Sequence, residues 1–168
     1  MFLRPGHVPS RVTTTASSPD GVTVRQADRA DLLGVVRIEK AAFPQPWPYD
    51  AFLGFLGEPG FLVAIEHGLI LGYIVADAGR RYGAVTGHVK DLAVHPDHRG
   101  RGIGTRLLDR GFDQLRRQDV SRVKLEVRAT NDAAIALYDR FGFEAHHTIP
   151  RYYDDGEDAV VLVTTLDP

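Results

Sequence analysis

The spacing of apolar residues in the first third of the chain predicts one strand followed by two helices. Residues 22–25 alternate between apolar and polar types, as a short strand does. Asp28 is placed to cap a helix that begins near Arg29, and Leu32, Leu33, Val36 and Ala41 supply its helical spacing. Prolines at 44, 46 and 48 end this pattern, and a second, short helix is predicted over 49–56.

The rest of the chain alternates less regularly between β-prone runs and helical patterns. Residues 61–66 and 69–77 predict a hairpin, and 88–94 predict a further strand. A helix is predicted over 101–117, with one apolar face formed by Ile103, Leu107, Leu108, Phe112 and Leu115. A strand at 123–127, a helix from the Asn131 cap to Phe141, and strands at 143–147 and 159–165 complete the pattern. This order predicts an α+β (mixed α/β) fold, because the steady alternation of a doubly wound fold is missing.

Length and composition fit one domain over 21–168. The chain has 168 residues, of which 43% are hydrophobic and 25% are charged, which is typical of a globular protein. Residues 1–20 lack periodicity and predict a flexible tail. Arg4 and Arg11, with no acidic residue before Asp20, leave a transit peptide as the less favoured interpretation of that tail.

Charge and residue usage exclude several classes of protein. The net charge of −2 argues against a protein that binds nucleic acid through its phosphates. The absence of cysteine excludes disulfides, cysteine–zinc sites and a cysteine nucleophile. No run approaches the roughly 18 apolar residues of a membrane span, and the N-terminus lacks the apolar core of a secretory signal. We therefore expect a cytoplasmic protein with no membrane contact, as a monomer or a weak dimer.

The segment 89–104 carries the clearest chemical signal, since a strand and a turn lead into a glycine-rich helix start. Unpaired amide groups and the helix dipole favour an anion at such an end, and glycines let a phosphate approach the backbone. Arg99 and Arg101 add positive charge. The segment predicts a phosphate cradle made by Arg99, Gly100, Arg101, Gly102, Ile103, Gly104 and Thr105.

The glycine spacing excludes the common nucleotide-binding loops. A P-loop needs Lys followed by Ser or Thr, but Gly104 is followed by Thr105 and Arg106. The dinucleotide fingerprint needs a third glycine, and positions 105 and 107 are Thr and Leu. What remains is Arg-x-x-Gly-x-Gly from Arg99 to Gly104.

This loop and its flanks resemble the GNAT superfamily of N-acetyltransferases. The supporting segments are Leu92-Ala93-Val94 before His95-Pro96, Leu125-Glu126-Val127-Arg128, Asn131, Ala136-Leu137-Tyr138 and Phe141-Gly142-Phe143. The resemblance covers about residues 22–166 and implies a central, mostly antiparallel sheet of about six or seven strands, splayed in the middle and flanked by about four helices. It also implies acetyl-CoA as cosubstrate, with its diphosphate on the loop and its pantetheine arm along Leu92, Ala93 and Val94. Asn131 would cap its helix and reach the cofactor.

A narrower resemblance concerns the acceptor. Phe43-Pro44 with Pro46-Trp47, residues 125–131 and Arg151-Tyr152-Tyr153 resemble the ribosomal-protein-alanine N-acetyltransferases, and Gly87-His88-Val89 is similar to archaeal and eukaryotic N-terminal acetyltransferases. The implied partner is a protein or peptide N-terminus, such as that of a ribosomal protein. An α-amine, with a pKa of about 7.7–8.0 against about 10.4 for lysine, needs only a modest base.

The resemblance implies that Glu126 is the base and Tyr138 the acid. From periodicity alone, Glu126 is equally a solvated acid at a strand end, and Tyr138 is equally a core residue. His88 is a second candidate base, because the ordinary histidine pKa near 6.5 suits the task, although a structural histidine fits the strand as well. Four aromatic residues are expected to wall the acceptor cleft, namely Phe43, Trp47, Tyr152 and Tyr153.

Three alternatives remain at this level. The acceptor is a small amine or a protein lysine rather than an N-terminus, or the chain is a non-catalytic acyl-CoA sensor. His95 and His98 have a spacing that suits a metal, but no further ligands accompany them, so no metal is expected.

Overall fold

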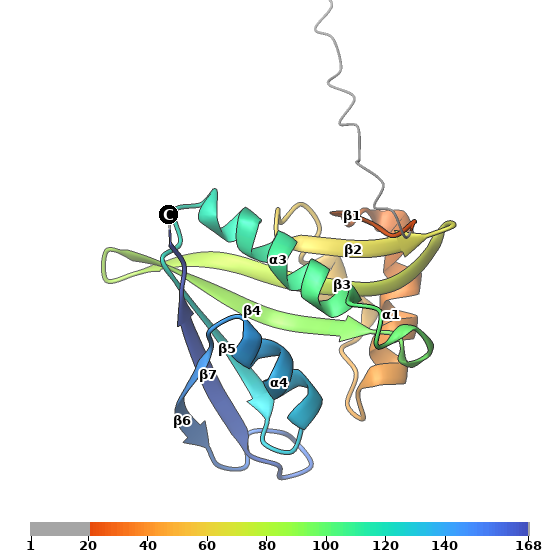
Figure 1. Ribbon diagram of the computed structural model, residues 1–168. Helices are drawn as coiled ribbons and strands as arrows, with labels where there is room; N and C mark the ends of the chain where they lie inside the picture. The colour runs from red at the N-terminus through yellow and green to blue at the C-terminus, as the bar shows by residue number, and fades with distance from the viewer. Residues whose placement is uncertain (1–20, 168) are drawn as a thin grey trace, which may run out of the picture.

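The computed structural model describes residues 21–167, so the predicted tail over 1–20 lies outside the described part of the chain. A seven-stranded sheet has the strand order β1-β2-β3-β4-β5-β7-β6, and all neighbours are antiparallel except β4 and β5 (Figure 1). The strands are β1 (Thr23–Gln26), β2 (Phe61–Glu66), β3 (Leu69–Arg81), β4 (Ala84–Val94), β5 (Arg122–Arg128), β6 (Glu144–Ile149) and β7 (Ala159–Thr165). The helices are α1 (Leu32–Ala42), α2 (Tyr49–Leu53), α3 (Ile103–Arg116) and α4 (Asp132–Arg140). The predicted mixed fold is confirmed.

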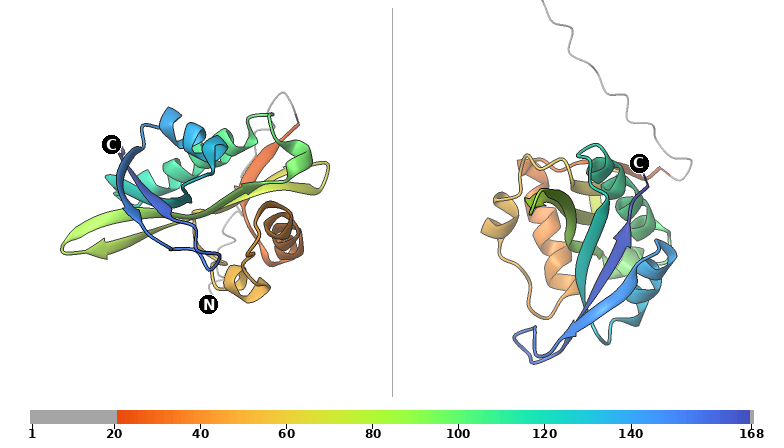
Figure 2. Two further views of the ribbon diagram at one scale, coloured as in Figure 1. Left: turned by 90° about the horizontal axis from the view of Figure 1, so that it is seen from below. Right: turned by 90° about the vertical axis from the view of Figure 1, so that its left-hand side faces the viewer.

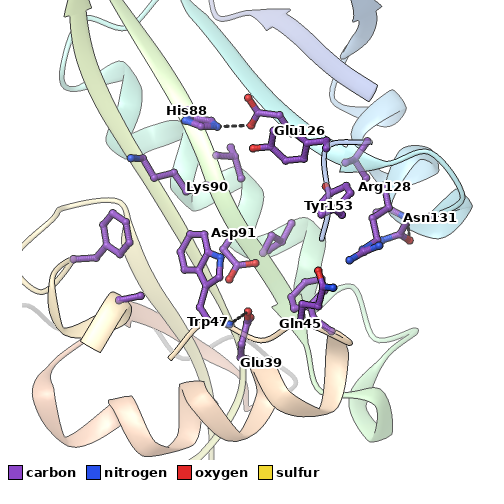
Figure 3. A pocket seen from close by; sticks show the side chains of 18 of the residues that line it. Glu39, Gln45, Trp47, His88, Lys90, Asp91, Glu126, Arg128, Asn131 and Tyr153 are labelled. Atoms are coloured by element: carbon purple, nitrogen blue, oxygen red, sulfur yellow. Dashed lines mark hydrogen bonds and ion pairs between the residues drawn. The ribbon is translucent and has the colours of Figure 1, made fainter. Parts of the chain in front are cut away.

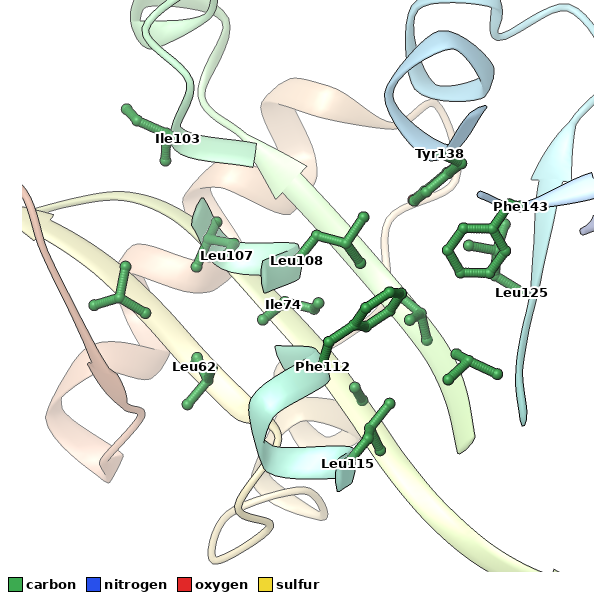
Figure 4. Packing of buried hydrophobic residues seen from close by; sticks show 14 of the residues in the cluster. Leu62, Ile74, Ile103, Leu107, Leu108, Phe112, Leu115, Leu125, Tyr138 and Phe143 are labelled. Atoms are coloured by element: carbon green, nitrogen blue, oxygen red, sulfur yellow. The ribbon is translucent and has the colours of Figure 1, made fainter. Parts of the chain in front are cut away.

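Helices cover both faces of the sheet and enclose two apolar cores. Figure 2 shows α3 and α4 on one face and α1 and α2 on the other. The α3 face that the sequence predicts is buried in the larger core (Figure 4). There Phe112 packs edge-on against Phe141. The second core lies between α1, α2 and the central strands and contains Phe52, Phe61 and Tyr73.

The buried face of α1 differs from the prediction. Leu33 is 76% exposed and Ala41 is also exposed, whereas the residues that face the sheet are Leu32, Val35, Ile38 and Glu39. Residues three and four apart share a helix face, so the true face is the one that includes the charged Glu39. That carboxylate obscured the apolar pattern in the sequence.

Two elements have different lengths from those predicted. The strands predicted to end at 77 and to begin at 88 continue to Arg81 and start at Ala84, and they form the long hairpin that protrudes in Figure 1. Tyr82 and Gly83 both have positive φ values, 49° and 81°, as the tight turn of a hairpin requires. In the other direction, α2 ends at Leu53 rather than near 56.

Two irregularities in β4 position the site. The strand pairs with β5 only between residues 86–88 and 122–124, so the two strands diverge beyond His88. A bulge then leaves Lys90 without a partner on β3, because Val75 pairs with Asp91 and Ala76 with Val89. The bulge reverses the alternation of side chains. Val89 faces the core under α3, whereas Ala93, and with it Asp91, faces the side of α1.

Candidate active site

A cavity of about 880 Å³ opens where β4 and β5 diverge (Figure 3). Its lining comes from the end of α1, the α1–α2 connection, α2 and the residues that follow it, β4, β5, α4 and the β6–β7 loop. The predicted residues among this lining are Phe43, Trp47, His88, Leu92, Glu126, Asn131, Tyr138, Tyr152 and Tyr153. The fold therefore brings the candidate base, acid and aromatic wall around one space.

His88 and Glu126, which the sequence treats as alternatives, form one pair. His88 lies opposite Lys124 in the parallel register, and Glu126 is two residues further along the same face of β5. The distance from His88 Nε2 to Glu126 Oε2 is 2.6 Å, and Lys124 Nζ lies 3.4 Å from the other carboxylate oxygen. The hydrogen bond from His88 is the main reason that the pKa of Glu126 is lowered. Glu126 is thus ionised near neutral pH and orients the imidazole.

Tyr138 is a core residue that also lines the cavity. Only 7% of it is exposed, and its ring packs edge-on against Phe143 at 5.5 Å. It also lines the cavity, and burial raises the pKa of its hydroxyl. The phenol therefore keeps its proton at neutral pH and remains available as a donor.

Two anchored segments form the aromatic wall of the cavity. Trp47 stacks on Phe55 with ring centroids 5.9 Å apart. Across the cavity, the guanidinium of Arg128 lies 4.0 Å from the centre of the Tyr153 ring, a cation–π contact. Arg128 also pairs with Asp155 at 2.7 Å, which ties the β6–β7 loop to β5. Tyr152 is 48% exposed at the rim.

The glycine loop has the backbone geometry that the cradle prediction requires. Gly100 and Gly102 have φ values of 78° and 76°, in the left-handed region that favours glycine. The first bond within α3 runs from the Arg106 amide to the Gly102 carbonyl, so the amides of residues 103–105 precede it at an open helix end. Arg101 pairs with Glu66 at 2.5 Å, which offsets its charge. The loop, with Ala93 and Val94, lies outside the lining of the cavity.

A third group of polar residues, missed from the sequence, lies beneath the cavity. Tyr73 is fully buried on β3, and its hydroxyl contacts both the Glu39 carboxylate and Asp91 Oδ2, the latter at 2.9 Å. Glu39 is 2% exposed and accepts a hydrogen bond from the Trp47 amide at 2.9 Å. Burial and the nearby Glu39 raise the pKa of Asp91 well above its ordinary value. The available signal was one acid on an otherwise apolar helix face and another inside an apolar strand.

Within 21–167, no three acidic or histidine side chains come together in a way that could hold a metal ion. His95 instead accepts a bond from the amide of Asp97. None of the helices in this part of the chain has the length and apolar character needed to cross a membrane.

Comparisons with known proteins agree with this geometry. Residues 32–143 match the acetyltransferase (GNAT) family, and the chain belongs to that family. An N-alpha-acetyltransferase of Saccharolobus solfataricus is 32% identical over 155 residues, covering 86% of this chain and 93% of the relative. The [ribosomal protein bS18]-alanine N-acetyltransferase of Escherichia coli is 32% identical over 147 residues, covering 86% and 97%. The structure of Ard1 from Thermoplasma volcanium matches with a TM-score of 0.82 at 27% identity, covering 88% and 99%.

Proposed function

We propose that this chain transfers the acetyl group of acetyl-CoA to the N-terminal α-amine of a protein, of the ribosomal-protein-alanine type. The observation that carries the proposal is the His88–Glu126 pair, set at 2.6 Å in a cavity that opens where β4 separates from β5. The relatives from S. solfataricus and E. coli, named as acetyltransferases of protein N-termini, support the choice of acceptor.

The residues present fit acetyl-CoA. Beyond residue 88, β4 no longer pairs with β5, so that edge of its backbone is open to a ligand, and the left-handed glycines expose the helix end for a diphosphate. Bound there, acetyl-CoA supplies the acetyl group as a thioester. Backbone amides near Leu92 to Val94 would hold the thioester carbonyl as negative charge develops. Asn131, which caps α4 by accepting from the Ala134 amide, is within the same cavity.

Side chains around the cavity accept and donate the protons that the reaction moves. An α-amine is partly neutral at pH 7, so the base has to remove one proton as the amine attacks. His88 donates its Nε2–H to the ionised Glu126, so it takes that proton at Nδ1, directly or through water, and Glu126 stabilises the resulting imidazolium. Tyr138, which keeps its proton because it is buried, donates it to the departing thiolate. The phenolate recovers a proton from solvent after the product leaves.

The acceptor is tested with a panel of peptides that differ in their first residue, including an N-terminal alanine, against a panel of small amines. Thiol release reports turnover, and mass spectrometry locates the acetyl group. We expect release with peptides and acetylation at the α-amine. Release only with small amines or at lysine would overturn the proposed acceptor, and tight acetyl-CoA binding without release for any amine would identify a non-catalytic sensor.

Gly102→Glu provides the matched control for cofactor-dependent release. A glutamate at this position would have to adopt the backbone φ of 76° that favours glycine. Its carboxylate would also place a negative charge where the diphosphate is expected. We expect neither release nor acetyl-CoA binding by calorimetry. Unchanged affinity would overturn the assignment of the cradle.

A further inference from the structure

Two carboxyl groups contact the Tyr73 hydroxyl, which has only one proton to donate. Its hydroxyl lies within hydrogen-bond distance of the Glu39 and Asp91 carboxyl groups, but a phenol carries a single O–H. If both acids were ionised, one contact would place two lone pairs against each other in a buried site. A second proton must therefore reside on one of the two acids.

The surroundings assign this proton to Asp91. Glu39 already accepts at both of its oxygens, from the Tyr73 hydroxyl and from the Trp47 amide. A protonated Asp91 donates to the Tyr73 oxygen, and Tyr73 in turn donates to Glu39. The chain of bonds then runs from β4 through β3 and α1 to the α1–α2 connection, and it carries a single negative charge.

We propose that this Glu39–Tyr73–Asp91 cluster holds the α1–α2 connection with Trp47, and so the acceptor side of the cavity, against β4, and that the attachment is released when Asp91 loses its proton. Asp91 is then a positioning residue for the acceptor peptide. The consequence for catalysis rests on the proposed function. Figure 3 shows Asp91 directed toward Glu39, with Trp47 beside it and the His88–Glu126 pair across the cavity.

Other charged groups near Asp91 act on it less directly. Lys90 on β4 pairs with Asp77 at 3.1 Å, and His88 is hydrogen-bonded to Glu126, so both side chains have other partners. Tyr138 on α4 is close enough for its pKa to respond to Asp91. The further titratable or charged residues that line the cavity are Asp50 on α2, Arg128 on β5, and Tyr152, Tyr153 and Asp154 in the β6–β7 loop.

The single tryptophan of the chain allows a test that needs no substrate. Trp47 fluorescence is recorded in the full chain as the pH is raised, for the wild type and for the Asp91→Asn and Glu39→Gln variants. We expect the wild-type fluorescence to change at a pH below that of global unfolding. Circular dichroism monitors the global unfolding. Asp91→Asn should remove it, because the amide donates to Tyr73 but cannot ionise. Glu39→Gln should move it to lower pH, because the charge opposing ionisation of Asp91 is gone.

Kinetics then connect the cluster to the acceptor. Asp91→Ala should raise the KM for the peptide about tenfold, the effect of losing one buried hydrogen bond, with little change in acetyl-CoA affinity. Asp91→Asn should recover most of that loss. A wild-type fluorescence signal that stays flat until unfolding, or an unchanged transition in Asp91→Asn, would overturn the proposal. Because fluorescence requires no acetylation, this result stands apart from the outcome of the peptide panel.

Discussion

The His88–Glu126 pair and the Glu39–Tyr73–Asp91 cluster lie at the same cavity but differ in how they hold their protons. His88 and Glu126 keep 29% and 13% of their side chains exposed, whereas Tyr73 is fully buried and Glu39 nearly so. The pKa of Glu126 is lowered by its bond to His88, while the pKa of Asp91 is raised by burial and by Glu39. An acid that is hydrogen-bonded to an imidazole at the cavity surface therefore suits proton exchange. A buried acid beside another acid retains its proton and serves to connect elements.

Among the variants that distinguish the two clusters, Glu126→Gln should have the largest effect, a loss of turnover. We expect turnover to fall by about tenfold or more, since Glu126 supports His88 in a general base step that typically contributes roughly 10²–10⁴. Acetyl-CoA affinity and the free energy of unfolding should stay near wild type, because the pair is close to solvent. Steady-state kinetics, calorimetry and urea unfolding measure the three quantities. Normal turnover in this variant would remove Glu126 from the proton transfer.

Tyr73→Phe should instead lower the stability of the fold. Loss of the hydroxyl leaves the acids on either side without their bridge, and we expect the free energy of unfolding to fall by about 1–3 kcal/mol. Urea unfolding measures the loss. Tyr82→Phe is the matched control, because Tyr82 is fully exposed at the hairpin tip and should leave stability unchanged. Equal stability of the two variants would mean that the bridge contributes nothing to the fold.

The smallest effects concern the dependence of stability on pH, where the clusters should have opposite signs. Asp91 has a raised pKa in the folded state, so its contribution is complete below the unfolded value of about 3.9 and is lost as the pH rises through the folded pKa. Glu126 has a lowered pKa, so its contribution is present above about 4.3 and is lost as the pH falls through the folded pKa.

Urea midpoints measured across pH test this difference in sign. Asp91→Asn should flatten the profile toward high pH, and Glu126→Gln should flatten it toward low pH. Both variants flattening the same side of the profile would contradict the assignment.

Local signals were predictable because they depend on neighbouring residues. The face of α3, the Asn131 cap and the left-handed glycines before α3 follow from helical spacing, capping chemistry and the absence of a side chain. The prediction for α1 was wrong at Leu33 and Ala41, because the charged Glu39 broke the apolar pattern of the buried face. Tyr73 was hidden for a similar reason, since an aromatic residue in a β-prone run is usually core.

By itself, the sequence determined most of the elements, the glycine loop before α3 and the residues that resemble those of the family. The tertiary structure decided which of them meet. Pairing of β4 with β5 over only three residues brought His88 to Glu126, and one extra residue at Lys90 placed Asp91 on the side of Tyr73 and Glu39. Strand register and bulges depend on contacts between distant segments. Side-chain alternation has a period of two, so a one-residue shift sends a carboxylate to the opposite face, and no local pattern records it.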